Sequence, residues 1–175
     1  ITRLFNMCIE KKTVPNCWKT AIVTPLYKGK GCKSDMDNYR PISVLSPLSK
    51  VFESLVAHQI TEHFESNNLF HSAQYGFRKY LSCEIALNTL IDSWRLSNNN
   101  KKKVLAIFID LKKAFDTVDH ELLILKLELY GFSRSSSDLI RSYLSNRSII
   151  TKCDRQLSSK VEIRAGILQG PVLGP

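Results

Sequence analysis

A continuous apolar run, Val104 to Ile109, is the feature of this sequence that most constrains the fold. The run has the length of a strand, and its unbroken apolar character predicts a central strand that is covered on both faces. Asp110 follows directly, and a carboxylate buried there without a partner would be costly. We therefore expect Asp110 to leave the sheet edge and to bind a cation such as Mg²⁺, which prefers oxygen ligands. An ordinary strand-end acid that caps the next turn is the alternative.

Several other segments have the sequence signals of helices. In the clearest one, aromatic and aliphatic side chains recur at every fourth position from Phe52 to Phe64, with Ser49 as the expected N-cap. The predicted helices cover Ser49–Asn67, Ser82–Leu96 and Asp119–Tyr130, with a further helix starting near Ser135 and Asp138 and the end of another at Leu4–Ile9. Their apolar stripes are expected to form the core.

Short β-branched and apolar segments predict the strands. Ala21–Tyr27 is one strand, closed by a basic loop at residues 28–31. Ile149–Cys153 and Lys160–Ile163 are expected to pair as a hairpin. Because helices and strands are mixed without a regular βαβ alternation, the sequence predicts an α+β fold. No repeat, low-complexity block or linker divides it, so residues 1–175 are predicted to form one continuous domain.

The chain is strongly basic, with 25 Lys and Arg against 16 Asp and Glu and a net charge of +9. A charge of this size favours nucleic acid as the partner, although it could also serve solubility alone. The five cysteines are scattered, and none has zinc-ligand spacing, which indicates reduced thiols. No apolar stretch approaches the roughly 20 residues of a membrane-spanning helix, so no membrane partner is expected.

Five stretches of the sequence resemble successive motifs of one protein family, in the order that the family has them. They are KTAIVTPLYKGKG (19–31), NYRPISVLSPLSKVFE (38–53), QYGFRKYLSCEIAL (74–87), FIDLKKAFDTVDH (108–120) and AGILQGPVLGP (165–175). The chain is similar to the reverse transcriptases of non-LTR retrotransposons, and jockey-like elements are the nearest subgroup. The resemblance implies part of a right-hand polymerase, with mainly fingers in residues 1–103, the first part of the palm in 104–175, and an incomplete palm sheet.

The resemblance also implies a polymerase site centred on Asp110. The Asp110 carboxylate and the Leu111 carbonyl are expected to bind Mg²⁺, with two ions in the complete site. Phe115 matches the aromatic gate beneath the sugar of the incoming nucleotide, where a ring leaves no room for a 2′-hydroxyl. A simple core aromatic is the alternative for Phe115. The nucleotide-binding residues that the resemblance implies are Lys28, Arg40, Leu111, Ala114, Phe115 and Gln169, and the two basic ones suit a triphosphate.

A second group of positions is expected to contact template and primer. Residues 74–78 resemble the template-contacting motif, where a glycine at position 76 permits close backbone approach. The nucleic-acid-binding residues implied are Gln74, Gly76, Phe77, Arg78 and Gly170. The chain departs from the family at Leu168 and Pro171, where Pro and Ser are usual.

The implied activity is that of an RNA-directed DNA polymerase, which extends a DNA primer along an RNA template with dNTP substrates. Such an enzyme would work in the nucleus or the cytoplasm and would not be secreted. The family's aromatic-x-Asp-Asp motif, which carries the remaining metal-binding carboxylates, does not occur in these 175 residues and is expected downstream. A non-catalytic nucleic-acid-binding remnant of a decayed or domesticated element is the alternative function.

Overall fold

The computed structural model describes residues 1–174, which form two compact units. The first unit combines Ile1–Gln59 with Lys113–Gly174, and the second unit is Ile60–Lys112. The mixture of helices with a partly parallel sheet confirms the predicted α+β class.

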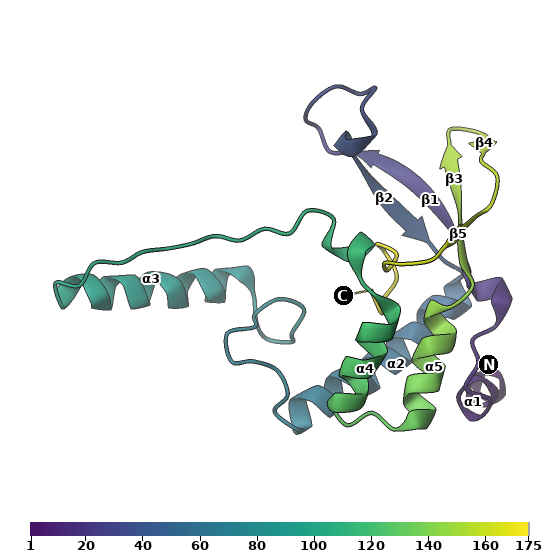
Figure 1. Ribbon diagram of the computed structural model, residues 1–175, viewed down its shortest axis with the longest axis horizontal. Coiled ribbons are helices and arrows are strands. Elements are labelled where there is room, and N and C mark those ends of the chain that lie inside the picture. Colours follow the sequence, from purple (N-terminus) through teal and green to yellow (C-terminus); the bar gives the residue numbers. More distant parts are fainter. Residues whose placement is uncertain (175) are drawn as a thin grey trace. The chain divides into compact units, whose positions relative to one another are not determined.

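The sheet of the first unit is built around β1 (Thr20–Tyr27). Figure 1 shows β1 between β2 (Tyr39–Val44) and β3 (Arg147–Cys153). The β1–β2 pairing is antiparallel and the β1–β3 pairing is parallel. Two short strands, β4 (Gln156–Leu157) and β5 (Val161–Ile163), pair antiparallel with β3. The predicted hairpin of residues 149–153 and 160–163 is therefore confirmed, with Ile149 opposite Val161.

The core of the first unit is centred on an aromatic cluster beside the sheet. The cluster consists of Phe5 from α1 (Thr2–Glu10), Trp18 from the short helix η1 (Asn16–Trp18) and Phe52 from α2 (Pro47–Ser66). Its three ring-centroid distances lie between 5.4 and 6.0 Å. All three side chains are buried, as are Val14, Ala21 and Val23 from the neighbouring segments and Leu139, Ile140, Tyr143 and Leu144 from α5 (Arg134–Leu144).

Two of the predicted helix starts, at Ser82 and Asp119, are capping residues in the structure. The Ser82 hydroxyl accepts from the Ile85 amide and caps α3 (Cys83–Asn99), and the Asp119 carboxylate accepts from the Leu122 amide and caps α4 (His120–Leu129). Helix α5 begins at Arg134, with Ser133 as its cap.

The predicted N-cap of α2 is wrong. The helix starts at Pro47, because proline suits the first helical position, where its missing N–H would have had no helical partner. Ser49 therefore lies inside the helix. Its buried hydroxyl donates to Glu53 Oε1 at 2.9 Å.

The predicted central strand at Val104–Ile109 is also wrong. The segment has no regular secondary structure, and Leu105, Ile107 and Phe108 are each at least 78% exposed. A strand requires a ladder of backbone hydrogen bonds with a neighbour, and no strand of residues 1–174 pairs with this run. Asp110 consequently follows an extended segment of the second unit, not a sheet edge.

Within residues 1–174 no helix has both the length and the apolar character that crossing a bilayer requires.

Candidate nucleotide and nucleic-acid site

Two lysines meet at one aspartate beside the β1–β2 hairpin. Lys28, directly after β1, donates from Nζ to the Asp37 carbonyl at 2.6 Å, and its amide bonds the Asn38 carbonyl at 2.8 Å. Lys113 Nζ lies 3.0 Å from Asp37 Oδ1, and this hydrogen bond raises the pKa of Lys113. The contact joins segments far apart in the sequence. Neither Asp37 nor Lys113 was predicted as a site residue, and the pairing has no sequence signal.

Arg40 lies at the same end of the hairpin. It stands on β2 opposite Leu26, immediately beside the Tyr27–Tyr39 pair, and its side chain is exposed. The predicted triphosphate-binding residues Lys28 and Arg40 thus lie at the same end of one hairpin, Lys28 directly after β1 and Arg40 on β2. Both are cationic, as phosphate binding requires.

The turn that carries Ala114 and Phe115 is held against a loop near the C-terminal end of the described chain. The turn is the short helix η3 (Ala114–Thr117), and its Phe115 carbonyl accepts a hydrogen bond from the Ile167 amide at 2.7 Å. His120 Nε2 donates to the Gly166 carbonyl at 2.7 Å. Gly166 has φ +83°, and a Cβ there would lie 2.7 Å from the Asp116 carbonyl oxygen, so the close approach depends on glycine.

The loop then reaches β2 through the predicted residues Gln169 and Gly170. The Gln169 carbonyl accepts from the Ser43 amide at 2.8 Å. Gly170 has φ +115°, and a Cβ there would lie 2.6 Å from the Ser43 carbonyl oxygen. In the first unit the fold therefore links Phe115, Gln169 and the strand of Arg40 through backbone contacts.

The predicted metal ligands Asp110 and Leu111 lie in the second unit, and both are exposed. Reverse transcriptases generally use divalent metal ions. In the part of the chain that the structure describes, no group of three or more His, Cys, Asp or Glu side chains could hold a metal ion. The carboxylate of Asp110 alone does not fit a complete two-ion site.

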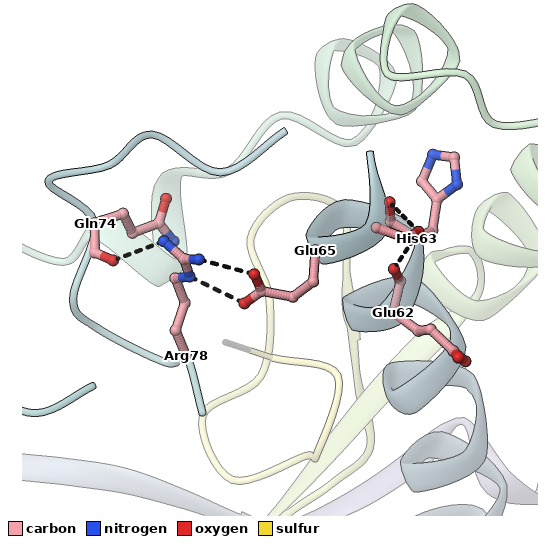
Figure 2. A network of polar contacts seen from close by, with 6 residues as sticks. Glu62, His63, Glu65, Gln74 and Arg78 are labelled. Carbon is pink, nitrogen blue, oxygen red and sulfur yellow. Dashed lines mark hydrogen bonds and ion pairs between the residues drawn. The ribbon is translucent and has the colours of Figure 1, made fainter. Parts of the chain in front are cut away.

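The predicted template-contacting segment is tied to α2 by Arg78 (Figure 2). Arg78 Nε and Nη2 donate to the two carboxylate oxygens of Glu65 at 3.0 and 2.8 Å. Its guanidinium also lies 4.9 Å from the centre of the Phe70 ring, and Nη1 reaches the Gln74 carbonyl at 3.5 Å. Figure 2 shows this fork between the loop and the helix. Arg78 therefore fixes the loop that contains Gln74.

The same loop exposes aromatic rings. Phe77 is 76% exposed and Tyr80 is 95% exposed, and both have left-handed backbone conformations, with φ of +61° and +62°. Bulky residues rarely adopt this conformation. Gly76 is exposed and has open space where a Cβ would stand, so its surroundings leave room for another chain's backbone. Tyr80 was not predicted, although its position two residues after Arg78 within a quoted motif could have indicated it.

We expect the Arg78–Glu65 fork to open in acid. Hydrogen bonding to Arg78 lowers the pKa of Glu65 below its ordinary value of 4.5. Because the folded pKa is depressed, the stabilising contribution is present above pH 4.5 and is lost as the pH falls through the folded pKa. An NMR titration should show the Arg78 Nε–H resonance constant above pH 4.5 and moving toward its unfolded position below it. In Glu65→Gln this titration should vanish, whereas Glu62→Gln, at an exposed carboxylate of the same helix, should retain it. A midpoint above 4.5 would contradict the assignment.

A basic hairpin end, an aromatic turn and a glutamine–glycine loop held together in one unit match the motif order of one enzyme family. Residues 28–175 match the family model of reverse transcriptase (RNA-dependent DNA polymerase). This match covers most of the chain, and the chain therefore belongs to the reverse transcriptase family. The family is one of RNA-dependent DNA polymerases.

The chain is similar to several polymerases of mobile elements. It is 31% identical over 175 residues to the probable RNA-directed DNA polymerase from transposon X-element of Drosophila melanogaster, covering 100% of this chain and 19% of the relative. The corresponding enzyme from transposon BS of the same fly is 31% identical over 172 residues, and the one from mobile element jockey is 29% identical over 172 residues. Each of these two comparisons covers 98% of this chain and 19% of the relative. The predicted resemblance to non-LTR retrotransposon enzymes is thus confirmed, over about a fifth of their length.

Proposed function

We propose that this chain is part of an RNA-directed DNA polymerase that extends a DNA primer along an RNA template. The observation that carries the proposal is the set of hydrogen bonds in the first unit that join η3, the loop of residues 166–170, β2 and His120. The elements that these contacts join carry side chains that would suit the phosphates, the sugar and the base of one nucleotide. A dNTP is the substrate that they would recognise together.

Each of these side chains has a distinct task in nucleotide binding. Lys28 and Arg40 neutralise the triphosphate, Arg40 by two parallel hydrogen bonds and Lys28 as a point charge. The Phe115 ring excludes a 2′-hydroxyl by contact, and Gln169 with Gly170 packs beside the base. The Lys28 and Lys113 ammonium groups, both bonded to Asp37 here, can exchange that oxygen partner for phosphate oxygens.

Asp110 and the Leu111 carbonyl would serve as metal ligands. The Mg²⁺ ions of a polymerase activate the primer hydroxyl and stabilise the leaving pyrophosphate. Since a single carboxylate does not fit two ions, Asp110 requires further carboxylates to complete the site.

The second unit would contact the template. Exposed Phe77 offers a face on which an unpaired base can stack, and Gln74 and Gly76 lie in the same loop. The fork from Arg78 to Glu65 holds this loop in place, so Arg78 would act on the template through the shape of the loop.

We expect Lys28→Ala and Arg40→Ala each to weaken dNTP binding by about tenfold or more, because hydrogen bonds to charged groups contribute about 1.5–3 kcal/mol. Calorimetric titration of the chain with dATP and Mg²⁺ measures this. Lys50→Ala removes an exposed lysine from α2 and serves as the control, with affinity unchanged. Equal affinities for all three variants would refute the nucleotide site.

A non-catalytic nucleic-acid-binding remnant is the second candidate, favoured by the net charge of +9. The same titration separates the two functions. A remnant would bind RNA with steep salt dependence and would show no binding of dATP.

A further inference from the structure

Glu53 is a fully buried carboxylate that the proposed function does not use. It lies on α2 in the first unit and is 0% exposed. Its Oε1 accepts from the Ser49 hydroxyl at 2.9 Å, and its Oε2 accepts from the Val172 amide at 2.9 Å and lies 3.5 Å from the Leu173 nitrogen. Burying a carboxylate is costly unless hydrogen bonds or opposite charges compensate. The burial of the Glu53 carboxylate therefore requires a structural explanation.

The first unit also contains a buried cation, Arg147. Arg147 is 5% exposed, donates from Nη1 to the Tyr143 carbonyl at 3.0 Å and stacks its guanidinium 4.5 Å from the centre of the Tyr143 ring. Burial raises the pKa of Tyr143, Arg147 opposes that shift, and the charge of Glu53 adds to it. Tyr143 thus stands within reach of both charges.

The two amides that face Glu53 belong to the loop that carries Gln169 and Gly170. On one side of the loop, the Gln169 carbonyl bonds Ser43 on β2. On the other side, Val172 bonds Glu53 on α2, and its own side chain is 42% exposed and contributes little packing. Only Gly170 and Pro171 separate the two attachments. A segment this short, fixed at both ends, has little freedom to move Gln169.

We propose that Glu53 is a positioning residue, whose buried carboxylate holds residues 169–173 against the first unit and so places Gln169 for the incoming nucleotide. The consequence for nucleotide binding rests on the proposed function, whereas the anchoring of residues 169–173 by Glu53 is independent of it. A charged acceptor is suited to this task because hydrogen bonds to a carboxylate are roughly twice as strong as neutral ones.

The test compares Glu53→Ala with Glu53→Gln by NMR and by dATP titration of the whole chain. In Glu53→Ala the Val172 amide resonance should move toward its unfolded position, and dATP affinity should fall by about tenfold, the loss of one charged hydrogen bond. Glutamine can accept from Val172 with its carbonyl and donate to the Ser49 hydroxyl. Glu53→Gln should therefore keep a protected Val172 amide, shifted by the loss of charge, and recover most of the affinity.

Val56→Ala is the matched control, because Val56 is buried on the same helix but has an aliphatic side chain, which cannot accept a hydrogen bond from the loop amides that Glu53 binds. It should lower stability and leave the Val172 resonance in place. The proposal is overturned if the Val172 amide resonance is unchanged in both Glu53 variants. Should Glu53→Ala fail to fold, an unchanged Val172 resonance in Glu53→Gln would overturn it alone. If the unsubstituted chain does not bind dATP, the proposed function fails, and the resonance still decides the anchoring.

Discussion

Phe52→Ala is expected to lower the free energy of unfolding by about 3–5 kcal/mol, the usual cost of truncating a buried aromatic side chain. Phe52 is 3% exposed and touches both Phe5 and Trp18, with ring centroids 5.4 and 5.8 Å away. Truncation removes the contact that joins α1, η1 and α2. Since whole domains are stable by only about 5–15 kcal/mol, much of the folded population should be lost.

Urea unfolding followed by Trp18 fluorescence measures this loss, because Trp18 is 4% exposed and reports on its own cluster. A Trp94→Phe background removes the second tryptophan of the chain, which lies in α3. Leu55→Ala is the control, since Leu55 lies on the same helix but is 51% exposed. We expect the control to cost less than about 1 kcal/mol. Similar losses for the two variants would mean that the aromatic cluster does not hold the first unit together.

The sequence predicted the parts of the fold that local patterns determine. The stripe through Phe52 and Val56 placed α2, and Ser82 and Asp119 marked two helix starts because a cap is a contact within one turn. Strand β2 was not predicted, and it contains Pro41, although proline is unusual inside a strand. Here Pro41 is tolerated because β2 lies at the edge of the sheet, where it pairs with β1 only.

The error at Val104–Ile109 has a different origin. Apolar character reports how well a segment would be buried, and it carries no information on whether a pairing strand is present. With no partner among residues 1–174, the run stays extended and exposed. The sequence also predicted one domain over residues 1–175, with mainly fingers up to residue 103 and the first part of the palm after it. That division stays a prediction, because the two compact units of the structure have other bounds.

Motif resemblance identified the residue types of the candidate site but not their supporting contacts. Phe115 and Gln169 could be selected from the sequence because their neighbours resemble family motifs. The bonds from Asp37 to Lys113 and from Glu53 to Val172 join residues 76 and 119 positions apart. No local pattern predicts contacts at such separations, because they depend on how the helices and strands pack.

Gly170→Ala is expected to detach the nucleotide loop from β2. An alanine there would place its Cβ 2.6 Å from the Ser43 carbonyl oxygen and 3.3 Å from the Ser43 nitrogen. Both are backbone atoms of a paired strand and cannot turn aside as a flexible side chain could. The residue also has φ +115°, which L side chains rarely adopt. The least costly relief is for the loop to move away, which breaks the hydrogen bond from Ser43 to Gln169.

The control variant Gly29→Ala separates the effect of the positive φ from the effect of the clash with the Ser43 backbone. Gly29 has φ +76°, but a Cβ there would meet nothing within 4 Å. The control should therefore lose only about 1–2 kcal/mol from backbone strain. Gly170→Ala should lose about 3 kcal/mol, toward the upper end of ordinary substitutions.

Hydrogen exchange at the Ser43 amide reports on detachment of the loop directly. It should accelerate in Gly170→Ala at least tenfold more than in Gly29→Ala, since a difference of about 1.4 kcal/mol in the opening equilibrium is a factor of ten. If Gln169 contacts the nucleotide, dATP affinity should fall together with Ser43 protection. Faster exchange with unchanged dATP affinity would confirm that β2 holds the loop in the unsubstituted chain. It would also mean that Gln169 does not contact the nucleotide. Unchanged exchange would mean that β2 does not hold the loop, and the close approach at Gly170 would then have no consequence for the site.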